Sequence, residues 1–142
     1  MTTKKLVLLI SALALVIVAT VTVVLVVAFT REGVAVNSGT FTGSPNNVAN
    51  DSWNISVARA NGSSRIDYTF TAANLSAMHV TSTNSSGSIT LTATQGDIER
   101  TFDITGAFND NIDMSGFEPG RVRLRLQFSN AENVEILINW AR

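Results

Sequence analysis

Three arginines at alternate positions, Arg121, Arg123 and Arg125, form what we call the arginine stripe, the candidate anion-binding face of this sequence. In a β-strand their side chains share one face and lie about 7 Å apart, so the guanidinium groups form a row. Such a row fits anionic groups that repeat along a ligand, as in phosphate-bearing wall polymers, acidic glycans or lipid headgroups. A structural explanation stays open, because neighbouring strands offer acidic cross-strand partners, namely Glu99, Asp103 and Glu135.

Catalytic chemistry finds little support in the residues. His79 is the only histidine, and the neighbouring residues supply no second metal ligand. No Gly-x-Ser-x-Gly segment accompanies it, so a nucleophilic serine has no recognisable position. Both lysines, Lys4 and Lys5, precede the apolar segment described below. We therefore predict that the protein is not an enzyme and needs no cofactor, and a secreted hydrolase built on His79 is the less favoured alternative.

Residues 109–113, Asn-Asp-Asn-Ile-Asp, gather oxygen donors of the kind that a hard cation such as Ca²⁺ prefers. The segment lacks the spacing and the glycine of an EF-hand loop, and Asx residues at a turn between strands explain it equally well. We assign no metal site from this segment, and cation binding there stays an open question.

The aromatic residues divide into two groups. Trp53, Tyr68 and Trp140 alternate in phase with aliphatic residues, so we predict that they lie in a core rather than on a sugar-stacking platform. Phe108 and Phe117 fall in predicted turns, and we expect them to be exposed contact residues.

The chain has 142 residues, a formal net charge of −1 and no cysteine. Residues 33–142 contain seven arginines, ten acidic residues and no lysine, a balance that argues against nucleic-acid binding. The absence of cysteine excludes disulfides and a lipidated cysteine anchor, and it favours a bacterial origin. Asn-x-Ser/Thr sequons, which bacteria would leave unmodified, occur at Asn50, Asn54, Asn61, Asn74 and Asn84.

Residues 6–29 are 24 consecutive residues without a charge. As a helix they would be about 36 Å long, enough to cross a bilayer, so we predict one transmembrane signal-anchor helix. The lysines before it place residues 1–5 in the cytoplasm and the rest of the chain outside, at the cell membrane. The alternative is a signal peptide cleaved after Ala28, which would make the protein secreted.

Beyond residue 29, hydrophobic residues alternate with polar ones in the manner of strands. We expect a stalk over 30–51 with one weak strand, and a main domain over 52–142 whose fold starts near residue 37. A turn is predicted at Asn61-Gly62, a strand over 75–81, and a closing hairpin of two strands over 122–128 and 134–140. Eight or nine short strands without a helical period indicate an all-β domain, an antiparallel β-sandwich of jelly-roll-like kind.

The segment 111–140 resembles the closing hairpin of small membrane-anchored β-sandwich proteins of Gram-positive bacteria. In that family a Pro-Gly turn precedes a strand, and an Asn-x-x-Gly turn leads to a last strand rich in Ile and Trp. Here Pro119-Gly120 provides the first turn, Val122 stands at the usual aromatic position and Asn133 at the usual glycine. The resemblance covers about a quarter of the chain and implies a fold and a location, since these proteins mostly lack an assigned activity.

We thus predict a single-pass membrane protein that displays a β-sandwich outside the cell as a binding or adaptor module. Its expected partner is an anionic cell-envelope polymer or an envelope protein, and not a nucleic acid. The alternative is a structural or assembly subunit of an envelope complex. The sequence leaves the ligand and the oligomeric state open.

Overall fold

A computed structural model describes residues 33–43 and 46–141. They belong to one compact unit, Glu32–Arg142. The predicted cytoplasmic segment 1–5 and signal-anchor helix 6–29 lie outside the described residues. Within the described part of the chain, no helix has the length and apolar character that crossing a bilayer requires.

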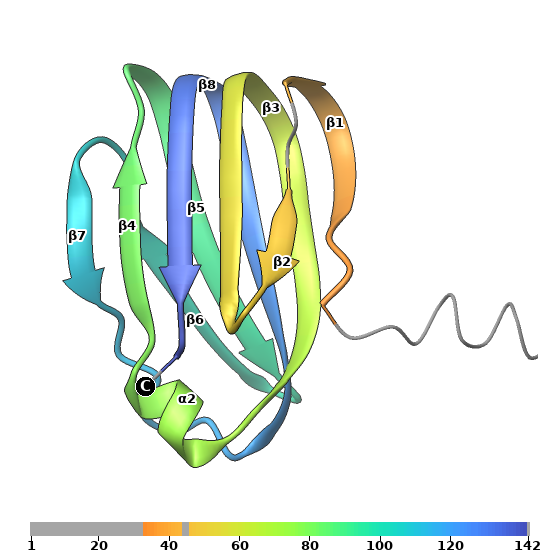
Figure 1. The fold of residues 1–142 in the computed structure, drawn as a ribbon, viewed down its shortest axis with the longest axis vertical. Helices are drawn as coiled ribbons and strands as arrows, with labels where there is room; N and C mark the ends of the chain where they lie inside the picture. Colours follow the sequence, from red (N-terminus) through yellow and green to blue (C-terminus); the bar gives the residue numbers. More distant parts are fainter. Residues whose placement is uncertain (1–32, 44–45, 142) are drawn as a thin grey trace, which may run out of the picture. The chain divides into compact units, whose positions relative to one another are not determined.

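The described chain consists of strands and one short helix (Figure 1). In chain order these are β1 (Val36–Thr42), β2 (Asn47–Ala49), β3 (Ser52–Phe70), α2 (Ala72–Ser76), β4 (His79–Thr83), β5 (Ser86–Gln95), β6 (Ile98–Asp103), β7 (Phe108–Asn111) and β8 (Gly120–Asn139). All the strand pairs are antiparallel and join into one sheet of eight strands, with β3 and β8 at its centre. The all-β and antiparallel parts of the prediction are confirmed.

The two central strands are long, and this overturns the predicted closing hairpin. The two segments of that hairpin, 122–128 and 134–140, do not pair with each other. Residues 122–128 and 134–139 belong instead to one continuous strand, β8, which pairs with β3. The first half of β8 faces residues 62–70 of β3, and its second half faces residues 52–60. Asn61-Gly62 likewise lies within β3 instead of turning the chain back.

Backbone conformation explains why these predicted turns do not reverse the chain. Asn130 and Asn133 have positive φ angles of 48° and 51°, which asparagine tolerates better than most residues. The pairing shifts between Ala60 and Gly62 of β3 at the same level. Single left-handed residues in a strand produce bulges, which bend it and change the phase of its side chains without reversing it.

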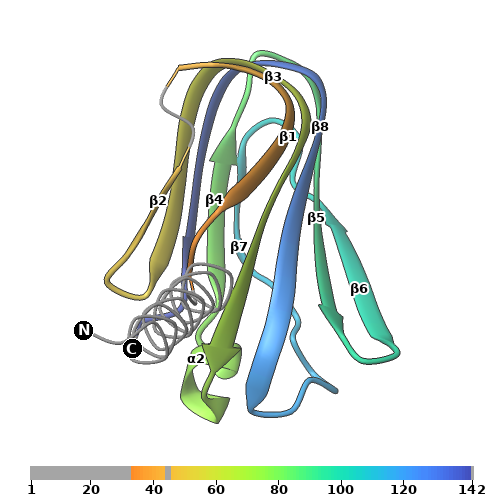
Figure 2. The same cartoon turned by 90° about the vertical axis from the view of Figure 1, so that its right-hand side faces the viewer.

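Because β3 and β8 bend, the sheet folds over and its two halves face each other (Figure 2). The first half-sheet contains β2, β4, β7 and residues 52–60 and 131–139. The second half-sheet contains β5, β6 and residues 62–70 and 120–128, with β1 along its edge. Alternate residues of both halves form the buried core, which includes Trp53, Phe70, Phe128 and Trp140. The predicted burial of Trp53 and Trp140 is confirmed, and Tyr68 packs half-buried against the same cluster.

Two predicted segments have a different structure. Residues expected to form a stalk contain β1 and β2, which pair with β3, so this segment is part of the sheet. Its alternation was hard to detect because all but one residue of β1 is exposed. The expected strand over 75–81 instead contains the end of α2 and the start of β4. A capping box between Thr71 and Asn74 starts that helix.

Candidate functional site

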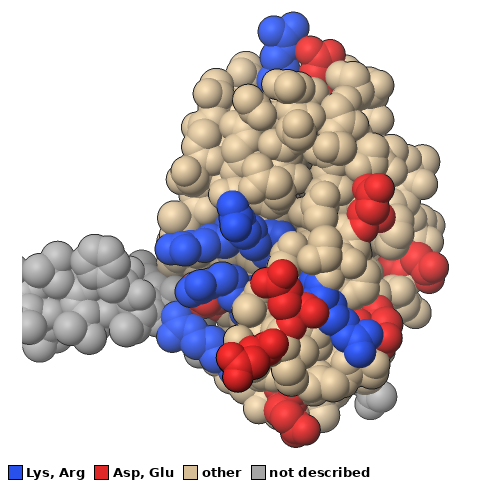
Figure 3. All heavy atoms as spheres, turned by 180° about the vertical axis from the view of Figure 1, so that it is seen from behind, with Lys and Arg blue, Asp and Glu red and all other residues tan. Residues whose placement is uncertain are grey.

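The arginine stripe lies on the outward face of the second half-sheet, as its spacing predicted. Arg121, Arg123 and Arg125 are exposed, while the residues between them point into the core with Val122 and Leu124 fully buried. Seen from behind, the basic side chains gather on one side of this face (Figure 3). The strand therefore separates a buried apolar side from a solvent-facing basic side.

A fourth arginine, Arg65, joins the stripe from the neighbouring strand. It lies directly opposite Arg125 in the pairing of β3 with β8, so the two side chains share the outward face. We call Arg65, Arg121, Arg123 and Arg125 the arginine patch. The sequence alone does not point to Arg65, because its proximity to Arg125 depends on the register between β3 and β8, two strands far apart in the chain. The one indication in the sequence that Arg65 faces solvent is the alternation of Arg65 and Asp67 with Ile66, which is buried.

Only one patch arginine has an acidic partner among the described residues. Arg123 Nε lies 3.1 Å from Asp67 Oδ1, and the other ion pairs of the described chain join Arg59 to Glu132 and Arg100 to Asp113. The partners suggested by the sequence, Glu99, Asp103 and Glu135, form no ion pair with the stripe in this part of the chain. Like charges placed directly opposite each other destabilise a sheet, and within the described chain neither Arg65 nor Arg125 has an ion pair that would offset this cost.

Polar side chains hold part of the patch in place. Arg125 Nη2 donates a hydrogen bond to Gln127 Oε1 at 3.0 Å. Gln127 Nε2 in turn donates to the carbonyl oxygen of Gly62 at 2.9 Å. The guanidinium of Arg125 is therefore oriented through a side chain that is itself fixed to the bend of β3.

Neutral and acidic residues border the patch on the side away from β3. Thr92 and Thr94 of β5 lie opposite Arg125 and Arg123, and β6 continues the face beyond them. On β6, Glu99 pairs with Thr94, which places its backbone two strand spacings, about 10 Å, from β8. Positive charge is thus concentrated over β3 and β8, where Asp67 offsets part of it, and Glu99 adds negative charge at the β6 edge.

The outward face of the first half-sheet has a different character. A shallow groove of about 300 Å³ is lined by Asn54, Ser56, Thr81, Thr83, Glu135, Ile136 and Leu137. Glu135 is the only charged residue of this lining. The two outward faces are therefore chemically distinct, one basic and the other almost neutral.

His79 of β4 contacts two asparagine side chains of the neighbouring strand β7. Its Nδ1 lies 2.8 Å from Asn111 Oδ1 and its Nε2 lies 2.8 Å from Asn109 Oδ1, across the pairing of β4 with β7. The oxygen-rich segment 109–113 thus begins as strand β7 rather than as a loop. Among the described residues, no group of three or more His, Cys, Asp or Glu is placed to hold a metal ion.

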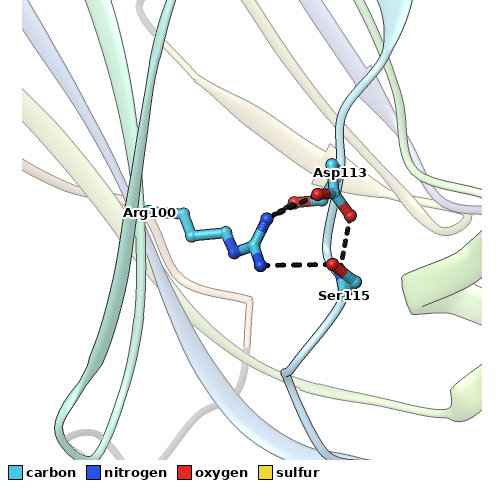
Figure 4. Close-up of polar contacts among 3 residues, drawn as sticks. All are labelled: Arg100, Asp113 and Ser115. Atoms are coloured by element: carbon cyan, nitrogen blue, oxygen red, sulfur yellow. Dashed lines mark hydrogen bonds and ion pairs between the residues drawn. The ribbon is translucent and has the colours of Figure 1, made fainter.

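The end of that segment is fixed by an ion pair (Figure 4). Arg100 Nη1 donates to Asp113 Oδ2 at 2.5 Å, and Arg100 Nη2 donates to the Ser115 hydroxyl at 3.1 Å. The pKa of Asp113 is lowered, chiefly by hydrogen bonds from the Ser115 side chain and backbone and then by Arg100. Because the folded pKa lies below the unfolded one, this carboxylate stabilises the fold above an ordinary aspartate pKa, and the contribution is lost as pH falls through the lowered value.

The two phenylalanines expected to be exposed contacts are not. Phe117 is buried with only 8% of its surface exposed, so that prediction is wrong. Phe108 lies in β7, half-buried against the core. Phe117 instead helps to line a cavity of about 380 Å³ between α2 and the segment 112–119, together with Leu75 and Met114. The turn residues around Phe117 do not reveal its burial, because an irregular segment packs its apolar side chains against the core.

Comparisons with known proteins give no match, since no protein-family model, no curated protein and no solved structure is significantly similar to the chain. Candidate functions therefore rest on the residues themselves, and the arginine patch is the described surface whose chemistry points most directly to a ligand.

Proposed function

We propose that the chain is a membrane-tethered extracytoplasmic binding module, a β-sandwich of jelly-roll-like kind whose arginine patch binds an anionic component of the cell envelope. The observation that carries this proposal is the position of Arg65 directly opposite Arg125, with no acidic partner for either among the described residues. An anionic ligand would remove the repulsion between them and gain several charge-assisted hydrogen bonds.

The geometry favours a ligand with repeated charges. The stripe supplies three guanidinium groups along β8, about 7 Å apart, and Arg65 broadens the row across to β3. No lining residue of the two cavities described above is a patch arginine, so these residues form an open surface rather than part of either cavity. A flat array of this kind suits an extended anionic chain or surface.

The proposed location follows from the sequence. Residues 6–29 would anchor the chain in the membrane, with residues 1–5 in the cytoplasm and the described domain outside. Cleavage after Ala28 would release the same domain as a secreted protein. The binding surface would be the same in both cases.

The first experiment measures binding of a soluble linear poly(glycerol phosphate) to the full chain in nanodiscs of neutral lipid. We expect an affinity that falls as salt rises, because the contacts are between exposed charges. Replacing Arg65, Arg121 and Arg125 together by serine should weaken binding roughly 100-fold, at about 1 kcal/mol for each arginine. This variant leaves the ion pair of Arg123 with Asp67 intact.

The matched control replaces the same three arginines by lysine. It keeps the charge and loses the planar guanidinium, so it should retain most of the binding to a flexible polyanion. Arg59→Ser, remote from the patch at a residue already paired with Glu132, should change the affinity little. Binding that ignores salt, or that survives in the serine variant, would refute the proposal.

A structural or assembly role is favoured by one specific feature, the open edge of β1. None of its seven residues is charged or proline, whereas the edge strand β6 carries Glu99, Arg100 and Asp103. Uncharged, exposed edge strands pair readily with other strands. If a second copy pairs there, sedimentation equilibrium in detergent should show dimers that Thr40→Lys abolishes. A monomer at every concentration would remove this candidate.

A further inference from the structure

The arginine patch lies beside the place where the chain enters the described domain. The backbone N–H of Gly33, the first described residue, donates a hydrogen bond to the carbonyl oxygen of Asp67 at 3.1 Å. Asp67 lies opposite Arg123 and follows Arg65 by two residues on the same face. Gly33, where the described chain begins, therefore lies beside the strand residues that carry the patch.

Chain length limits how far this point can be from the membrane. Gly33 follows Phe29, the last residue of the apolar run, after three intervening residues, so four Cα-to-Cα steps join the two. Even when fully extended they span at most about 14 Å. Electrostatic attraction in physiological salt acts over about 8 Å, so the tether keeps the patch within reach of the headgroup layer in many orientations of the domain.

The distribution of charge selects among those orientations. The patch arginines, of which only Arg123 has an ion pair in the described chain, lie over β3 and β8 near Gly33, whereas Glu99 and Asp103 lie at the β6 edge. An anionic surface would attract the first region, so the second half-sheet would turn toward the surface with its β3 and β8 side leading. The face of the first half-sheet offers no comparable cluster, since Glu135 is the one charged residue lining its groove.

From these observations we infer that the anionic partner of the arginine patch is the headgroup layer of the membrane that anchors the chain. This inference rests on the proposed function, because it names the ligand of the same patch. The domain then lies with its second half-sheet toward anionic phospholipid headgroups and presents the neutral groove of the first half-sheet away from the membrane. A flat array of guanidinium groups matches a planar field of phosphates, and Arg binds each phosphate with two donors.

Because the native chain has no cysteine, one introduced cysteine can carry a single label, and this allows a direct test. Thr101→Cys places a donor dye on the second half-sheet, and Thr83→Cys places it on the outward face of the first; both positions are exposed. The full chain is reconstituted in vesicles of neutral phosphatidylcholine, with or without phosphatidylglycerol, and energy transfer to a headgroup acceptor is measured. Thr101 lies away from the tether, so its transfer reports the orientation of the domain.

We expect phosphatidylglycerol to raise transfer from position 101 and not from position 83. High salt should cancel the rise, and so should serine at Arg65, Arg121 and Arg125, whereas lysine at the same positions should preserve it. For the serine variant we expect the population that lies on the membrane to fall roughly 100-fold. Circular dichroism and thermal unfolding of each variant check that a lost signal does not come from a lost fold.

Three outcomes would overturn the inference, and they have different meanings for the proposed function. Equal transfer with and without phosphatidylglycerol, combined with patch-dependent binding of poly(glycerol phosphate), leaves the proposed function standing with a polymer as the ligand. Absence of both signals defeats the inference and the proposed binding function together. Release of the full chain from vesicles by alkaline carbonate would show that residues 6–29 do not anchor it. The inference that the patch binds the anchoring membrane would then be wrong.

Discussion

Gly62→Ala is expected to lower the free energy of unfolding by about 3 to 5 kcal/mol, a large part of the 5 to 15 kcal/mol that domains usually have. Gly62 has a φ of 138°, in a region that side chains rarely permit. A Cβ atom there would lie 2.1 Å from the carbonyl oxygen of Ser38 and 2.8 Å from the Cα of Gly39. Both neighbours are backbone atoms of β1, so β1 itself would have to move.

Urea unfolding followed by circular dichroism measures this effect, and Gly96→Ala is the matched control. Gly96 also has a positive φ, 57°, but an added Cβ would meet nothing within 4 Å. We expect this control to cost about 1 kcal/mol, for the backbone conformation alone. If the two alanine variants lose the same stability, the close approach of β1 to β3 contributes nothing, and the explanation is wrong.

The bend at Gly62 also links stability to the candidate site. Its carbonyl oxygen accepts the hydrogen bond from Gln127 that orients Arg125. On one side of the bend Ala60 pairs with Ala131, and on the other Arg65 pairs with Arg125. The irregular pairing that folds the sheet is therefore the same feature that fixes the register of the arginine patch. A variant that shifts this register would separate Arg65 from Arg125 without changing either residue.

What could be predicted from the sequence is what depends on alternation within one strand. Arg123 and Val122 are neighbours in the chain, so their opposite faces follow from strand geometry alone. Trp53 and Trp140 were placed in the core for the same reason, and both are fully buried. The turn between β5 and β6, with Gln95 opposite Ile98, likewise has a local signal, the Gly96-Asp97 pair.

What could not be predicted depends on which strands become neighbours. Asn130 and Asn133 look like turn residues, yet each half of β8 has its own partner in β3, and that pairing keeps the strand continuous. The pair of Arg123 with Asp67 and the meeting of Arg65 with Arg125 come from this same long-range register. Periodicity within one segment carries no information about its register with another segment. Contacts between strands that are far apart in the sequence therefore cannot be predicted from it.

Trp140→Ala is expected to cost about 3 to 5 kcal/mol of unfolding free energy, as for other large aromatic residues in cores. Its ring is fully buried, with centroids 4.9 Å from Tyr68 and 5.2 Å from Phe70. Its backbone N–H donates to Asp51 at 3.0 Å, and its carbonyl oxygen accepts from Asn74 Nδ2 at 2.9 Å. These contacts join the segment after β8 to α2 and to the turn before β3, so a cavity here would loosen all three.

Trp140→Phe distinguishes the contribution of the aromatic ring to stability from that of the indole N–H. Among the described residues, the buried indole N–H has no hydrogen-bond partner, and leaving such a donor unsatisfied costs about 1 to 3 kcal/mol. Phenylalanine would keep an aromatic ring beside Tyr68 and Phe70 and remove that donor. We therefore expect its stability in urea to lie within about 1.5 kcal/mol of the native chain. If the Phe variant is as unstable as the Ala variant, the indole N–H has a partner and contributes to the fold. The cost of Trp140→Ala could then not be assigned to the loss of the ring.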